Sequence, residues 1–186
     1  LRCRVVTLYF DVYRYRDLFL NLFRRELRVK YKGSVLGLAW TLVLPLVLVG
    51  VYTLVFSTLL RTTSVDHFPL FVVSGLLTWV FFQTSLQSSC ASLLGQASLV
   101  KQVRFPRQLL PLSVVATNVV TFAVMLAIVL PINLALIPET RETFWAVFPL
   151  ALVLLAFVGG LSLVVACANV LYRDIEHLVA TILLPW

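Results

Sequence analysis

The chain has few charged residues, and long stretches of it contain none. Only 12% of its 186 residues are Asp, Glu, Lys or Arg, whereas 61% are hydrophobic. About a quarter of a soluble domain is normally charged, so this composition excludes an ordinary soluble protein. Charged residues are absent from four stretches of at least 28 residues each: 33–60, 67–100, 108–138 and 143–172.

Each uncharged stretch is long enough to cross a lipid bilayer as a helix. A helix rises about 1.5 Å per residue, so about 20 apolar residues cross a hydrocarbon core about 30 Å thick. We therefore predict an all-α membrane protein forming a single domain, residues 1–186. Four complete transmembrane helices and the start of a fifth are predicted at residues 35–60, 69–94, 112–137, 144–171 and 178–186.

Cysteine and histidine are too few and too scattered to indicate a metal site. The three cysteines, Cys3, Cys90 and Cys167, form no CxxC motif and have no histidine at ligand spacing, so we interpret them as small packing residues. His67 and His177 each lie beside an acidic residue at a predicted membrane edge. We interpret both histidines as interfacial polar residues and predict no metal site.

The predicted spans also lack the charges that proton-coupled and voltage-sensing proteins place within the membrane. No GxxxxGK[ST] loop is present to bind nucleotide phosphates. The sequence contains no convincing catalytic constellation either. We therefore predict that the chain is not an enzyme and that energy for any transport comes from elsewhere.

The basic residues indicate the orientation of the spans. Lys and Arg accumulate on the cytoplasmic side of membrane proteins. With a cytoplasmic amino terminus, 13 of the 15 Lys and Arg residues lie inside, and only Arg61 and Arg141 lie outside. The same distribution explains the net charge of +7 through topology and contact with anionic lipids, so we predict no nucleic-acid partner.

An amphipathic helix is predicted over residues 11–32, before the first span. One face of this helix is apolar, and the opposite face is rich in Arg and polar residues. This arrangement suits a helix lying in the cytoplasmic membrane interface. Two interpretations stay open at this point: the helix only rests on lipid, or it also contacts a partner or an anionic substrate. The apolar face consists of Tyr15, Leu18, Phe19, Leu22 and Phe23.

Polar side chains crowd the cytoplasmic half of the second predicted span. Such a face would be costly toward lipid, so we expect it to face protein or a water-filled path. The residues are Gln83, Thr84, Ser85, Gln87, Ser88, Ser89 and Ser92.

Aromatic side chains are frequent on the first two spans. They are consistent with an interfacial belt or bundle packing, and equally with a lining on which sugar rings stack during passage. The residues concerned are Trp40, Tyr52, Phe56, Trp79, Phe81 and Phe82.

Four separated strings resemble the permease subunits of ABC-2 type exporters of polysaccharides and polyol phosphates. They occur in the order of that family and on the matching sides of the predicted membrane. The strings are ELRVKYKGSVLGLAWTLVLP at 26–45, FPLFVVSGLLTWVFF at 68–82, SLVKQVRFPRQLLPLS at 98–113 and YRDIEHLV at 172–179.

This resemblance implies a six-helix fold in the full-length family, with short outer re-entrant helices before the last span. The chain begins with Leu1 and ends at Trp186, inside the predicted fifth span, so we expect it to be truncated, chiefly at the carboxyl end. The resemblance also implies a multi-pass protein of the inner (cytoplasmic) membrane.

The resemblance also implies how transport is powered and what is transported. Permeases of this family form homodimers, and each protomer pairs with a separate ABC ATPase subunit that uses ATP and Mg²⁺. No cofactor is implied for the permease itself. The implied cargo is a lipid-linked glycan or polyol phosphate, such as O-antigen, capsule or teichoic acid, moved outward from the cytoplasmic face.

Three groups of residues receive roles from this resemblance. The ATPase-coupling candidates lie between the second and third spans, the candidates for the pyrophosphate headgroup lie at the end of the amphipathic helix, and three residues form a structural loop. The ATPase-coupling candidates are Lys101, Arg104, Phe105, Pro106 and Arg107. The headgroup candidates are Arg24, Arg25, Arg28, Lys30 and Lys32. The structural loop consists of Tyr172, Arg173 and Asp174.

Other functions remain as alternatives to glycan export. An ABC-2 exporter of a small drug or lipid would have the same architecture. An integral membrane transferase would need an acid/base pair or metal ligands near the membrane surface, for which the sequence offers only weak candidates. A scaffold subunit without a transport role is a further alternative.

Overall fold

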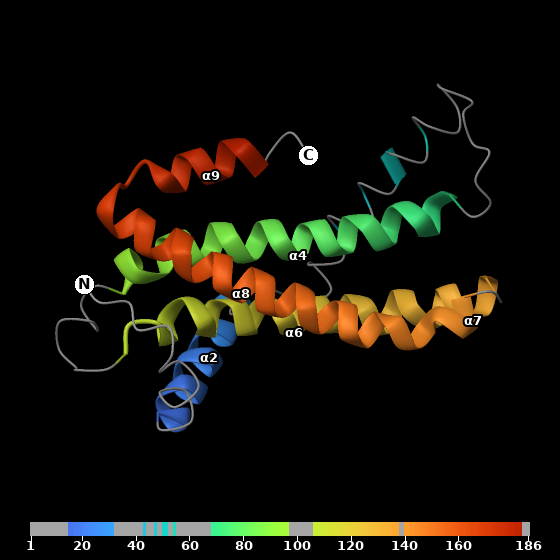
Figure 1. The fold of residues 1–186 in the computed structure, drawn as a ribbon, viewed down its shortest axis with the longest axis horizontal. Coiled ribbons are helices and arrows are strands. Elements are labelled where there is room, and N and C mark those ends of the chain that lie inside the picture. Colours follow the sequence, from blue (N-terminus) through green and yellow to red (C-terminus); the bar gives the residue numbers. More distant parts are fainter. Residues whose placement is uncertain are drawn as a thin grey trace. The chain divides into compact units, whose positions relative to one another are not determined.

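The structure is a computed structural model that describes residues 15–31, 43, 47, 50, 51, 54, 68–96, 106–137 and 140–183. Every regular element in these ranges is helical, which confirms the predicted all-α class for the described part of the chain. The elements are α2 (Arg16–Tyr31), α4 (Phe68–Gly95), α6 (Leu109–Leu136), α7 (Thr140–Thr143), the 3₁₀ helix η4 (Phe144–Ala146), α8 (Val147–Leu171) and α9 (Ile175–Leu183) (Figure 1).

Three helical stretches are long and apolar enough to cross a membrane: Leu70–Gly95, Leu109–Leu136 and Phe144–Leu171. The corresponding predictions were 69–94, 112–137 and 144–171. The first predicted span, 35–60, lies outside the described residues apart from isolated helical positions.

Two helices begin three residues earlier than hydropathy predicts. Helix α6 starts at Leu109 because Pro111 falls in its first turn, where a missing backbone N–H costs nothing. Helix α9 starts at Ile175, before the apolar run, and Glu176 lies in its first turn, where the helix dipole favours a negative charge.

The predicted outer loop at 138–143 contains the short helix α7. Glu142 lies in the first turn of α7, where a carboxylate interacts favourably with the helix dipole. Helix η4 follows directly, so the turn between α6 and α8 is partly helical.

The chain divides into two compact units. Unit 1 comprises residues 1–30, 83–118 and 154–186; it contains most of α2, the end of α4, the start of α6, the end of α8 and all of α9. Unit 2 comprises residues 31–82 and 119–153. Each long helix therefore contributes one part to each unit.

The apolar face of α2 packs against protein in unit 1. Leu22 is 4% exposed and clusters with Leu109 and Leu110, the first residues of α6, and α2 crosses α6 there (Figure 1). Burying a leucine side chain stabilises by about 1.5–3 kcal/mol. The partly buried residues around this cluster are Tyr15, Leu18, Phe19 and Leu93.

Polar burial differs between the units. All described buried polar residues lie in unit 1, whereas the described buried residues of unit 2 are apolar. The prediction that the polar face of the second span faces protein is confirmed for three serines, and Ser88 is exposed. The buried polar residues are Ser85, Ser89, Ser92, Ser113, Thr117, Asn118, Ser162 and Asn169.

Aromatic side chains organise unit 2. The Phe81 and Phe122 ring centroids lie 4.7 Å apart, and both side chains are buried. At the start of α8, Phe144 and Phe148 meet edge to face at 5.4 Å, and Trp145 beside them is 76% exposed. Such exposed aromatic groups are typical of the ends of membrane-spanning helices.

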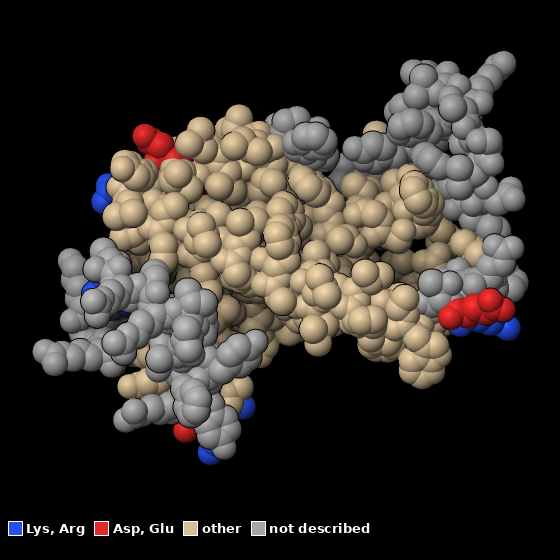
Figure 2. Space-filling view, in the orientation of Figure 1, with Lys and Arg blue, Asp and Glu red and all other residues tan. Residues whose placement is uncertain are grey.

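Charged side chains avoid the middle of the long helices. In Figure 2 the blue and red patches lie on α2 and at helix ends, and the surface along the long helices is tan. The uncharged spans predicted from the sequence correspond to this distribution within the described residues.

Candidate functional site

The solvent-facing arc of α2 carries three arginines. Arg24, Arg25 and Arg28 are all exposed, and Arg24 and Arg28 are one helical turn apart. Five N–H donors on each guanidinium suit phosphate oxygens. These three headgroup candidates therefore form one accessible basic arc, whereas Lys32 lies outside the described residues.

Lys30 is separated from that arc. With 3.6 residues per turn, it lies about 120° or more around the helix from each of the three arginines. Its Nζ donates a hydrogen bond to Oδ1 of Asn118, a buried residue of α6, at 2.8 Å. Burial lowers the pKa of the Lys30 ammonium from its ordinary value of 10.5.

Glu26 lies on the same side of α2 as Lys30, one turn earlier. Its Oε1 accepts a hydrogen bond from Nε2 of Gln96, directly after α4, at 2.6 Å. Hydrogen bonds to an ionised carboxylate are about twice as strong as neutral ones. The packed side of α2 thus combines the apolar contacts of Leu22 with polar contacts to both α4 and α6.

The ATPase-coupling candidates are described only in part. Lys101, Arg104 and Phe105 lie outside the described residues. The carbonyl oxygens of Pro106 and Arg107 accept hydrogen bonds from the N–H groups of Leu109 and Leu110, at 3.1 and 3.3 Å. Arg107 is exposed in the turn that precedes α6, two residues before Leu109 of the cluster that holds α2.

The predicted structural loop joins α8 to α9. Tyr172, Arg173 and Asp174 are all exposed. Backbone hydrogen bonds order the turn: the N–H of Ile175 donates to the Tyr172 carbonyl at 3.1 Å, and the N–H of Leu178 to the Asp174 carbonyl at 2.9 Å.

Asn169 is a site residue that the sequence analysis missed. It is fully buried in α8, and its Nδ2 donates to the carbonyl oxygen of Cys90 in α4 at 2.7 Å. Its Oδ1 accepts a hydrogen bond from the N–H of Glu176 in the first turn of α9 at 3.2 Å. The available signal was a strongly polar amide inside an uncharged span, a position where such groups bond across helices.

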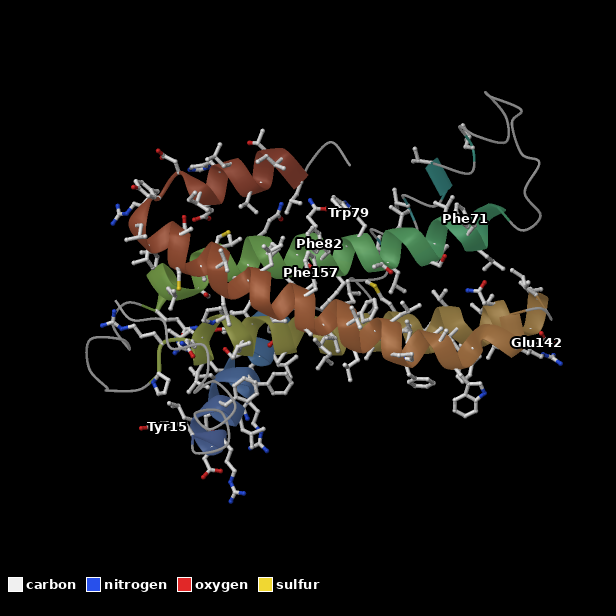
Figure 3. All side chains as sticks on the ribbon, in the orientation of Figure 1. Tyr15, Phe71, Trp79, Phe82, Glu142 and Phe157 are labelled. Atoms are coloured by element: carbon white, nitrogen blue, oxygen red, sulfur yellow. The ribbon has the colours of Figure 1, made fainter. Side chains whose placement is uncertain are left out.

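The glycan-path candidates on α4 differ in their surroundings. Trp79 and Phe82 have ring centroids 5.6 Å apart and are half-buried on α4 (Figure 3). Phe81 is 3% exposed and packs on Phe122, so packing accounts for its aromatic ring. The remaining candidates, Trp40, Tyr52 and Phe56, lie outside the described residues.

No cluster of three or more His, Cys, Asp or Glu residues that could hold a metal ion occurs in the described parts of the chain. The described acidic residues are instead distributed over α2, α7, the α8–α9 turn and α9. Hydrogen bonds between helices, rather than a metal or acid/base centre, distinguish the described polar groups of unit 1.

Comparison with known proteins identifies the family of the chain. The sequence model of the family "ABC-2 type transporter" matches residues 17–186. The chain belongs to the ABC-2 type transporter family. This ABC-2 chain is 36% identical over 179 residues to the O-antigen export system permease protein RfbA of Myxococcus xanthus. The aligned region covers 95% of the chain and 67% of that protein.

Two O-antigen export system permease proteins RfbA of Klebsiella pneumoniae are also similar to this ABC-2 chain. They are 27% and 26% identical over 169 and 165 residues, covering 88% of the chain and 63% of each relative. The chain therefore spans about two thirds of the length of these curated relatives. Family membership together with three helices able to cross a bilayer makes it part of a multi-pass membrane protein.

Proposed function

We propose that the chain is the permease part of an ATP-driven exporter that moves a lipid-linked polysaccharide or polyol phosphate polymer from the cytoplasmic face across the inner membrane. The observation that carries this proposal is the match to the ABC-2 family over residues 17–186, with relatives named as O-antigen export permeases. The amino terminus is cytoplasmic in this proposal, as the distribution of basic residues predicts.

A separate ABC ATPase subunit, using ATP and Mg²⁺, supplies the energy, and two permease protomers form the transport unit. The ATPase contacts the permease at the residues between α4 and α6, with Phe105 as an anchor and Arg107 as a charged contact. The exposure of Arg107 at the start of α6 supports this assignment, because the guanidinium is accessible to a partner.

The headgroup assignment rests on Arg24, Arg25 and Arg28. All three are exposed on α2, whereas Leu22, which packs on α6, is buried. Charge-assisted hydrogen bonds from three guanidinium groups suit a pyrophosphate. Lys30 is a weaker candidate because its ammonium bonds to Asn118. Along the sugar path, Trp79 and Phe82 remain candidates for stacking.

Copurification tests the ATPase assignment. The full-length permease is purified in detergent with the ATPase subunit encoded beside it, and again with Phe105→Ala plus Arg107→Ala. We expect the ATPase to copurify with the original protein and to be lost from the double variant. The absence of an ATPase partner from the unaltered permease would sink the transporter assignment.

Polymer export tests the headgroup assignment. Arg24→Gln, Arg25→Gln and Arg28→Gln are combined in the full-length protein, and surface polymer is quantified in cells. We expect loss of export with an unchanged amount of permease in the membrane. Arg16→Gln is the matched control, because Arg16 is an exposed arginine of the same helix, two turns earlier. Normal export by a correctly inserted triple variant would refute the assignment.

A further inference from the structure

Two hydrogen bonds between distant parts of the sequence converge on the end of α4. Gln96 donates to Glu26, 70 residues away on α2, and the Cys90 carbonyl accepts from Asn169, 79 residues away on α8. All of these residues belong to unit 1. Residues 90–96 therefore contact both the amino-terminal helix and the corner that leads into α9.

Asn169 joins α4 to α9 as well as to α8. Its amide uses both ends: Nδ2 bonds to the Cys90 carbonyl, and Oδ1 bonds to the first-turn N–H of Glu176. The first N–H groups of a helix have no partner within that helix, so Asn169 supplies one from the preceding helix. A single buried side chain thus fixes the start of α9 relative to α4.

Glu26 and Gln96 do the same for α2. Leu93, near the end of α4, packs against the cluster that contains Leu22 of α2, so the 2.6 Å hydrogen bond and this apolar cluster together hold α2 near the end of α4. The charged carboxylate makes this bond stronger than a neutral amide pair. Movement of the end of α4 without α2 would break both contacts.

We propose that residues 90–96, the end of α4 together with Gln96 directly after it, form a mechanical junction that carries force to α2 through Gln96–Glu26 and to α9 through Asn169. The proposal rests on the proposed function, because the force is applied by the ATPase at the coupling residues that follow Gln96. Asn169, Gln96 and Glu26 are then positioning residues: they touch neither nucleotide nor cargo, and they make α2 and α9 respond together.

Hydrogen exchange with and without a non-hydrolysable ATP analogue tests the junction. The full-length permease in complex with its ATPase is compared in three forms: unaltered, Asn169→Leu and Gln96→Leu. In the unaltered complex we expect the analogue to change exchange in both α2 and α9. In Asn169→Leu only α2 should respond, and in Gln96→Leu only α9 should respond.

Without nucleotide, loss of one hydrogen bond should speed exchange of the released helix about fivefold. Asn133→Leu on α6, in unit 2, is the matched control and should leave α2 and α9 unchanged. The amount of polymer exported per ATP hydrolysed should fall in both test variants, a change that a purely structural role would not produce in equal amounts of assembled complex.

Compensating exchanges keep the test decisive if a leucine variant does not assemble. Gln96→Glu places two carboxylates together and should uncouple α2, and adding Glu26→Gln should restore its response. Asn169→Asp keeps the acceptor for the N–H of Glu176 but loses the donor to the Cys90 carbonyl. The amides of α9 should therefore stay protected from exchange without nucleotide, while their response to nucleotide is lost.

The outcomes separate the junction from the proposed function. A response of α9 that persists in Asn169→Leu, or no response of either helix in the unaltered complex, would overturn the junction. An unaltered permease that binds no ATPase overturns the proposed function and the force transmission with it. Exchange without nucleotide then decides alone whether the contacts join these helices.

Discussion

The ammonium of Lys30 and the amide oxygen of Asn118 are 2.8 Å apart, although 88 residues separate them in the sequence. Asn118 is 5% exposed, and its Nδ2 has no hydrogen-bond partner among the described residues. This pair ties the end of α2 to α6, about two and a half turns after α6 begins. A basic residue that the sequence analysis groups with the headgroup candidates thus forms a contact between helices.

The Lys30 pKa provides a first prediction. Because burial disfavours the ammonium form, half of the Lys30 side chains should be neutral at a pH below 10.5. Competitive labelling of lysine amines as a function of pH, read by mass spectrometry, measures this midpoint. A Lys30 midpoint at or above 10.5 would contradict the burial of its amine.

The same shift predicts a pH dependence of α2 docking. The folded-state pKa of Lys30 is lower than its unfolded value, so folding releases a proton and stability rises with pH between the two pKa values. Below the folded pKa the full desolvation cost is present. Protease cleavage within α2 should therefore slow as pH rises toward 10.5, and this slowing should be absent from Lys30→Met.

Leu22 and Leu20 form a matched pair on α2. Leu22 is 4% exposed in the cluster with Leu109 and Leu110, whereas Leu20 is 43% exposed. Leu22→Ala should destabilise the docking of α2 by about 2–5 kcal/mol, the usual cost of a buried leucine. Leu20→Ala should change it by less than about 0.5 kcal/mol. Denaturant titration of the purified permease, followed by exchange in α2, gives both values.

Phe81 and Phe71 allow the same comparison on α4. Phe81 packs on Phe122 and is 3% exposed, whereas Phe71 is 68% exposed. Phe81→Ala should cost about 3–5 kcal/mol of stability in detergent, because it removes buried area and a ring contact. Phe71→Ala should leave the thermal midpoint nearly unchanged. Equal midpoints for the two variants would show that Phe81 is not buried in the folded protein.

Ser89 and Ser88 test whether the polar face of α4 is packed or wet. Ser89 is fully buried, and its Oγ has no hydrogen-bond partner among the described residues, whereas Ser88 is exposed. Ser89→Ala should be neutral or stabilising, because it removes an unsatisfied buried hydroxyl. Ser89→Leu should destabilise by about 1–3 kcal/mol through overpacking, and Ser88→Leu should not. Thermal unfolding in detergent separates these outcomes.

Hydropathy is a local property of the sequence, and it predicted the three described long helices. An uncharged run must become a helix in a bilayer, because only helices and closed barrels satisfy every backbone hydrogen bond there. The three described long helices accordingly fall near the predicted ranges. The helix starts at Leu109 and Ile175 were predicted late. A proline fits the first turn of α6, and Asn169 and the helix dipole stabilise the first turn of α9, and hydropathy reports neither effect.

The polar contacts between helices could not be predicted in the same way. Arg28 and Lys30 are both basic and two residues apart, yet Lys30 reaches across to α6 and bonds to Asn118, whereas Arg28 lies on the other side of α2. Asn169 has two partners that lie on different helices. Which polar groups meet depends on how the helices pack and rotate about their axes, and no local pattern contains that information.

The sequence alone therefore determined the helical membrane class, the family and the amphipathic nature of α2. These follow from the composition, the motifs and the helical spacing of apolar residues, respectively. Only the tertiary structure decided that α2 docks on α6 and that residues 90–96, at the end of α4, contact α2 and the corner before α9. The physical reason is that a lone buried amide or ammonium is stabilised only by a partner brought to it through folding.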